Sequence, residues 1–168
     1  MRIVMSCGVA LAVSLLLSDP NVAMAAAQPP AAADAPASVA GEPLFSDIVL
    51  RSGALKGVVD QWRANLASTP DWLVSPEAFG RFKVEAESLA ALDMQGHLIL
   101  KERGTDGDLK CILRGISEDI PVKVAAVAAA ATPAERTVAL DELAYLLNDN
   151  VEVITSPPQP DAQSGVPT

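Results

Sequence analysis

Side chains able to do chemistry are few in this chain, and Cys111 and His97 stand out among them. Cys111 lies in the stretch LKCILRGISEDIP (residues 109–121), and His97 is the only histidine. A thiol becomes reactive when a nearby base or cation favours the thiolate, and one histidine supplies one ligand of a metal site that takes about four. The spacing permits a catalytic Cys111–His97 pair, but no other feature of the sequence supports one.

Motifs that would indicate a hydrolase, a nucleotide site or a haem are missing from the sequence. There is no GxSxG, HExxH, phosphate-binding loop or CxxCH. The acidic stretch that starts at Asp106 fails as a calcium loop, because its twelfth residue is Ser117 and not glutamate. Adjacent acids such as Asp141 and Glu142 are typical of a solvated helix face. We therefore expect no catalytic residues, no metal site and no cofactor.

The N-terminal residues predict export from the cytoplasm. Arg2 precedes an apolar run over residues 9–17, and Ala23-Met24-Ala25 supplies the small-x-small pattern of a signal peptidase site. The run is too short for the roughly 20 apolar residues that cross a bilayer. We expect cleavage near Ala25, a periplasmic or secreted location and no stable membrane span after cleavage.

Cys111 becomes an odd cysteine if the signal is removed, because Cys7 leaves with it. On a helical wheel Cys111 points roughly 160° away from the apolar stripe of its helix. Free cysteine is nevertheless among the most buried residue types, and a helix can be covered on two faces. We interpret Cys111 as a buried, inert thiol. An intermolecular disulfide that forms a homodimer and a reactive thiolate are the alternatives.

Composition divides the chain into four segments. Nine of the 13 prolines fall outside residues 44–154, and the flanking stretches have few bulky apolar residues. Such segments bury too little apolar surface to offset the entropy of ordering. We predict a signal peptide at 1–25, a disordered Pro/Ala-rich linker at 26–43, a helical domain at 44–154 and a disordered tail at 155–168.

Apolar residues repeat at helical spacing through residues 44–154. Caps predict helix starts at Ser75-Pro76-Glu77 and at the capping box Thr132–Glu135. Gly96 marks a possible break, Pro121 separates one helix from an alanine-rich one, and the last helix is predicted to end at Asn148–Asn150. The apolar faces are those of Leu55, Val58, Val59, Trp62 and Leu66, then Phe79, Phe82, Ala86, Leu89, Leu92 and Leu100, then Leu109, Ile112, Leu113, Ile116 and Ile120, then Leu140, Leu143, Ala144 and Leu147.

These patterns predict an all-α fold, a compact bundle of four to five helices with short connections. The alternative is an α+β fold with a small hairpin around residues 97–113, turning at Asp106-Gly107, and a third strand at 151–155. Leucine-rich runs at helical spacing favour the bundle, since strands prefer β-branched residues.

The charge of the chain bears on its partners. Its net charge is −9 and its Lys and Arg residues form no stripe, so nucleic acid is excluded as a partner. We expect a non-enzymatic exported or periplasmic helical interaction protein: an adaptor, chaperone-like factor or inhibitor that binds another exported protein. The alternative is a small-molecule or metal binder with an interhelical cavity. The candidate binding residues are His97, Cys111, Trp62 and Trp72.

Overall fold

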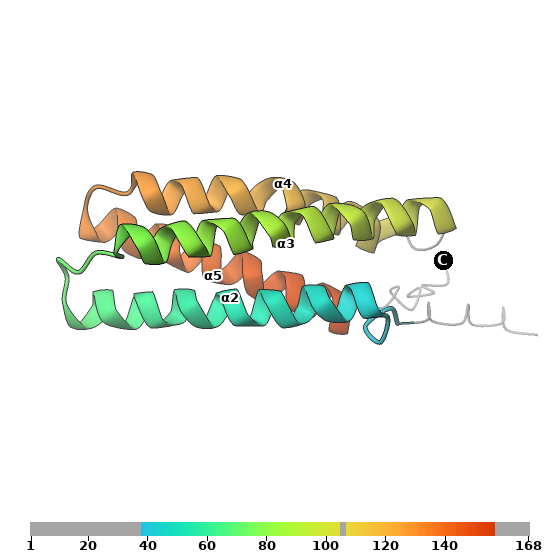
Figure 1. Ribbon diagram of the computed structural model, residues 1–168, viewed down its shortest axis with the longest axis horizontal. Helices are drawn as coiled ribbons and strands as arrows, with labels where there is room; N and C mark the ends of the chain where they lie inside the picture. Colours follow the sequence, from blue (N-terminus) through green and yellow to red (C-terminus); the bar gives the residue numbers. More distant parts are fainter. Residues whose placement is uncertain (1–37, 105–106, 157–168) are drawn as a thin grey trace, which may run out of the picture. The chain divides into compact units, whose positions relative to one another are not determined.

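The computed structural model describes residues 38–104 and 107–156, which form a bundle of four helices (Figure 1). The helices are α2 (Pro43–Ser68), α3 (Pro76–Arg103), α4 (Gly107–Ala129) and α5 (Pro133–Thr155). Successive helices run antiparallel, α3 packs against α4, and α2 packs against α5. The all-α bundle is thus confirmed.

The alternative hairpin around residues 97–113 is wrong for the described residues. Residues 97–103 form the last turns of α3, and 107–113 form the first turns of α4. The third strand predicted at 151–155 is the end of α5. In each case leucine and isoleucine at helical spacing outweigh the local turn and β-branched residues.

The two caps predicted at helix starts are present. The Ser75 hydroxyl accepts a hydrogen bond from the Ala78 N–H at the start of α3, and Gly104 ends this helix with a left-handed φ of 65°. Thr132 and Glu135 form the predicted capping box, in which each side chain accepts from the other residue's main-chain N–H. Two of the helix starts are therefore set by local sequence.

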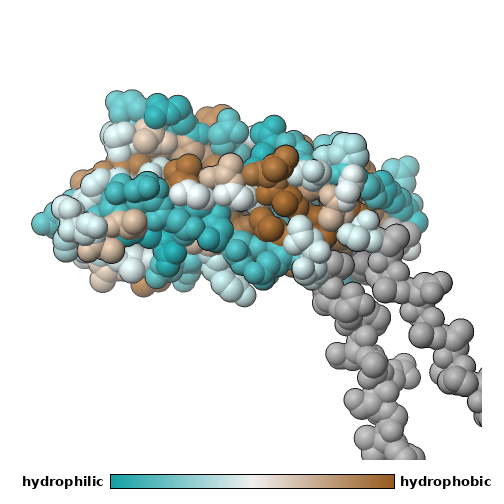
Figure 2. Space-filling model, turned by 90° about the horizontal axis from the view of Figure 1, so that it is seen from below, coloured by the Kyte–Doolittle hydropathy of each residue, from teal (hydrophilic) through white to brown (hydrophobic). Residues whose placement is uncertain are grey.

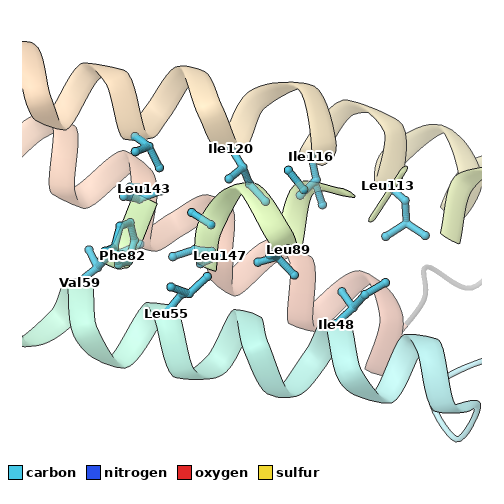
Figure 3. Close-up of a cluster of buried hydrophobic side chains, with 14 of the residues drawn as sticks. Ile48, Leu55, Val59, Phe82, Leu89, Leu113, Ile116, Ile120, Leu143 and Leu147 are labelled. Carbon is cyan, nitrogen blue, oxygen red and sulfur yellow. The ribbon is translucent and has the colours of Figure 1, made fainter. Parts of the chain in front are cut away.

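The core runs the length of the bundle between the four helices (Figure 3). Most of the predicted apolar faces are confirmed, but Val58 is 40% exposed. The buried face of α2 does not include Val58, but it does include Ser52, which the apolar pattern did not predict. The largest fully buried apolar side chains are Phe45, Ile48, Val59, Leu89, Leu100, Leu113, Ile120, Leu143, Leu147 and Ile154.

Three predicted helix ends are wrong, because the helices continue through them. Gly96 lies inside α3, where a Cβ atom would stand 3.1 Å from Leu113 and 3.2 Å from Phe45, so this glycine allows close approach of the helices. Pro121 lies inside α4 and is exposed, so its ring and missing N–H are accommodated on the outside of the bundle. Asn150 lies inside α5 because its polar side chain is paired in the core.

The helical domain begins earlier than residue 44. Val39 and Ala40 pack against the core, and the Arg103 guanidinium binds both carboxylate oxygens of Glu42. This hydrogen-bonded pair lowers the pKa of Glu42 below its ordinary value. The predictions for the signal peptide, for linker residues 26–37 and for tail residues 157–168 lie outside the described residues. Within the described part, no helix is long and apolar enough to cross a membrane.

Candidate functional site

A buried polar cluster joins three of the four helices. Ser52 of α2, Asp93 of α3 and Asn150 of α5 are all fully buried. The Asn150 Nδ2 group donates to Ser52 Oγ at 3.0 Å and to the two Asp93 carboxylate oxygens at 3.1 and 3.0 Å. The Oδ1 atom of Asn150 is buried without a hydrogen-bond partner.

Burial changes the acid–base behaviour of Asp93. Desolvation raises the pKa of Asp93 to about 7, and the hydrogen bond from Asn150 offsets only part of this effect. The neutral carboxyl supplies an O–H donor that the carboxylate lacks. Asp93 therefore changes charge near neutral pH within this buried polar cluster.

The polar cluster has the character of a structural layer. Asp93 is its one ionisable group, the Ser52 hydroxyl is joined to Asn150 and not directly to Asp93, and its residues line none of the recesses described below. Polar groups at core positions are costly unless they pair with one another, so they disfavour helix alignments in which they do not meet. We infer that the cluster sets the alignment of α2, α3 and α5.

The sequence contains a sign of this cluster that our sequence analysis missed. Asp93 lies four residues after Leu89 and three before Gly96, so it continues the apolar face of its helix. Asn150 follows Leu147 by three residues in the same manner. A polar residue where an apolar stripe continues predicts a buried polar group, although it does not show which residue will be its partner.

Cys111 and His97 have different surroundings in the structure. Nδ1 of the half-buried His97 lies 2.6 Å from the main-chain carbonyl of Lys110, which links α3 to α4. Cys111 is exposed, so the prediction of a buried thiol is wrong. Each helix of this bundle is covered mainly on its core side, and Cys111 points away from the core. Among the described residues, no three His, Cys, Asp or Glu side chains gather in a way that could hold a metal ion.

The two tryptophans also differ. Trp62 is buried, with its ring centre 4.8 Å from that of Phe82 and 6.4 Å from that of Phe79. This aromatic cluster fills the core between α2 and α3, so Trp62 contributes to packing. Trp72 lies in the connection between α2 and α3, is partly buried, and lines a recess at that end of the bundle.

This end recess has a volume of about 260 Å³. Its walls come from the end of α2, the 69–75 connection, the start of α3, the end of α4 with the residue after it, and the start of α5. They are apolar except for the side chain of Arg136. The lining residues are Leu66, Trp72, Leu73, Val74, Pro76, Phe79, Val127, Ala128, Ala130, Arg136 and Leu140.

Two shallower apolar grooves flank the C-terminal half of α4. One of about 360 Å³ lies against α3, and one of about 510 Å³ lies against α5. Ala129 lines both grooves. After the exposed Pro121 and Val122, the outer side of this half-helix exposes four small apolar side chains, Ala125, Ala126, Ala128 and Ala129, which we call the alanine face. Neither Cys111 nor His97 lines the end recess or the two grooves.

Apolar side chains also reach the surface elsewhere. On the face seen in Figure 2 they gather in a patch surrounded by polar groups. The most exposed large apolar residues are Tyr145, Leu50, Leu73, Val84 and Val122. Four of them lie on four different helices and Leu73 lies in the 69–75 connection, and single exposed apolar residues of this kind are ordinary for a folded protein.

Comparison with family models, with curated proteins and with solved structures finds no match to this chain. The described residues themselves offer an exposed alanine face between two grooves, an apolar recess with one arginine, and an enclosed polar cluster. The first two are suited to binding, and the third is suited to holding the helices in alignment.

Proposed function

We propose that this protein is a non-enzymatic exported interaction protein that binds a helix of another exported protein along the alanine face of α4. The observation that carries the proposal is an exposed face of small side chains with an apolar groove on each side. The proposed location depends on the signal-like N-terminal sequence.

Alanines favour a helical partner for a geometric reason. Two helices pack with axes 8–10 Å apart, and the distance shortens as the side chains at the contact become smaller. An approaching helix can therefore lie on the alanine face and place its larger apolar side chains in the grooves at either side. This is the helix-in-groove mode, with apolar anchors at i, i+3, i+4 and i+7.

The groove edges are polar. Lys83 pairs with Glu87 at the edge of one groove, and Lys123 pairs with Glu142 beside the other. A polar rim around an apolar centre is the usual anatomy of a protein interface. Because the chain carries a net charge of −9, a partner helix with basic flanks would associate faster than a neutral one.

The proposal is tested with a photo-crosslinking amino acid placed at Ala129 and, as a matched control, at Ala91, an exposed alanine of α3 outside these grooves. In intact cells we expect one stoichiometric adduct from position 129 and none from position 91. Ala129→Arg should abolish copurification of the crosslinked protein, whereas Ala91→Arg should not. Equal crosslinking from both positions, or binding that survives Ala129→Arg in a folded protein, would refute the proposal.

A further inference from the structure

The end recess combines an apolar interior with one positive charge. Its walls include the aromatic rings of Trp72 and Phe79 and the aliphatic side chains of Leu66, Val127 and Leu140. It lies at the end of the bundle where the α2–α3 and α4–α5 connections meet, on the left in Figure 1. Arg136 is its only charged lining residue.

Several N–H donors of the Arg136 guanidinium have no hydrogen-bond acceptor among the described residues. A guanidinium carries five N–H groups, and here one Nη donates to the Ala131 carbonyl at 3.2 Å and the other to the Pro70 carbonyl at 3.4 Å. Its Nε is buried without a hydrogen-bond partner. The two carbonyls come from the two connections, so they hold the guanidinium at the recess while leaving N–H groups on it unused.

Among the described residues no carboxylate forms an ion pair with Arg136, although its charge acts at longer range on the neighbouring Glu135 and helps to lower the pKa of that carboxyl. Lys83, which lines the groove between α3 and α4, is paired with Glu87. Arg63, which lines a further recess between α2 and α5, is paired with Asp60 and Asp141. Arg136 has no ion pair within the described ranges, and the carboxylate of the adjacent Glu135 accepts from the main-chain N–H groups of Ala131 and Thr132. A partly buried guanidinium beside apolar walls favours an anion that brings its own apolar group.

We propose that the end recess binds a small amphiphile with one carboxylate and an apolar chain, the carboxylate accepting hydrogen bonds from Arg136 and the chain contacting Trp72 and Phe79. The volume of about 260 Å³ lies just below the 300–1,000 Å³ of drug-sized ligand sites, which indicates a medium-chain acid rather than a long-chain one. This site is separate from the alanine face and does not depend on the proposed protein partner.

The probe is decanoate, titrated by calorimetry into the full chain below its micelle concentration. Decanol and decyltrimethylammonium have the same chain with a neutral and a cationic head, and butyrate has the head with a short chain. We expect one saturable decanoate site and binding of the other three at least about tenfold weaker, the factor that corresponds to one charge-assisted hydrogen bond.

Decanoate binding by single-residue variants then shows whether the ligand occupies the end recess. Arg136→Gln should weaken decanoate to the affinity of decanol, whereas Arg81→Gln, which removes an exposed arginine of α3 outside the recess, should leave it unchanged. Ala129→Arg should also leave decanoate binding unchanged, which separates this site from the protein-binding face. Equal affinities for decanoate and decanol, or no saturable binding, would overturn the proposal. The wild-type comparison of head groups decides the matter even if Arg136→Gln unfolds.

Discussion

The two halves of the bundle are built on different principles. In the half where α2 begins and α3 ends, which we call the polar-layer half, Gly96 brings α3 close to Phe45 and Leu113, and Ser52, Asp93 and Asn150 form an enclosed layer. In the opposite half, the recess half, a cluster of Trp62, Phe79 and Phe82 fills the centre, and the alanines of α4 leave its surroundings open.

The comparison shows that side-chain size determines where recesses remain at the surface of a helical bundle. Large rings at the centre of the recess half hold α2 and α3 together, but alanines on α4 cannot fill the space between neighbouring helices at the surface. The grooves and the end recess follow from this mismatch. The polar-layer half instead uses paired polar groups, which stabilise one alignment at the cost of desolvation. The polar cluster and the proposed binding surfaces therefore lie in different halves of the bundle.

The largest expected change in the free energy of unfolding comes from a substitution at the centre of the recess half. Trp62→Ala should lower the free energy of unfolding by about 3–5 kcal/mol, because it removes a buried aromatic side chain between two phenylalanines. Trp72→Ala, in the partly buried connection, should cost about 1 kcal/mol. Urea denaturation followed by circular dichroism measures both. Similar losses for the two variants would mean that the connection belongs to the core and that the recess is not a separate feature.

The next largest expected effect is on the pH dependence of stability, which depends on Asp93 in the polar-layer half. The folded pKa of Asp93 is raised from 3.8 to about 7, so between these values the folded state holds a proton that the unfolded state releases. Stability from this group is complete below about pH 4 and is lost as pH rises to about 7. At 1.4 kcal/mol per pKa unit, the loss is about 4 kcal/mol between 3.8 and about 7.

Asp93→Asn tests this pH dependence. It should leave stability near pH 4 almost unchanged and raise it at pH 8 by up to about 4 kcal/mol, because the amide stays neutral while still able to pair with Asn150. Urea denaturation at pH 4, 6 and 8 gives the comparison, with Asp141→Asn, an exposed carboxylate, as the control. Below pH 4 both proteins should lose stability, since the pKa values of Glu42, Asp60 and Glu135 are lowered by their hydrogen-bond partners. A wild-type protein equally stable at pH 5 and pH 8 would contradict the assignment.

A smaller effect is expected at Pro121, on the edge of the groove between α3 and α4. Because α4 continues through this position, Pro121→Ala should restore a main-chain donor and stabilise the protein by about 1–3 kcal/mol. Pro133→Ala, at the first turn of α5, should change stability by less than about 0.5 kcal/mol, because proline suits that position. Thermal unfolding compares them. A destabilised Pro121→Ala protein would show that the proline is needed for the packing of α4.

The smallest effect is expected at Cys111. Since this thiol is exposed, Cys111→Ser should change the free energy of unfolding by less than about 0.5 kcal/mol. The exposed position leaves the alternative of a homodimer through a Cys111 disulfide open to test on a non-reducing gel. A dimer band that disappears with Cys111→Ser would support it, and a wholly monomeric wild-type band after mild oxidation would exclude it.

Much of the fold could be predicted from local sequence. The stripe from Leu55 to Leu66, the Ser75 cap and the Thr132–Glu135 capping box were sufficient to predict three of the four helix faces or starts. The incorrect helix ends, at Gly96, Pro121 and Asn150, are residues that usually interrupt helices in isolation. Each is accommodated here by its neighbours: a close helix contact, an outward-facing ring, or a buried hydrogen bond.

The sequence by itself determined that these residues form amphipathic helices, because a period of 3.6 and the caps depend only on neighbours along the chain. Only the tertiary structure decided which side chains meet. The pairing of Asp93 with Asn150, the exposure of Cys111 and the placement of Arg136 beside Trp72 depend on helices that are distant in sequence. A stripe shows which face of a helix is apolar, but the residues that cover that face belong to other segments of the chain.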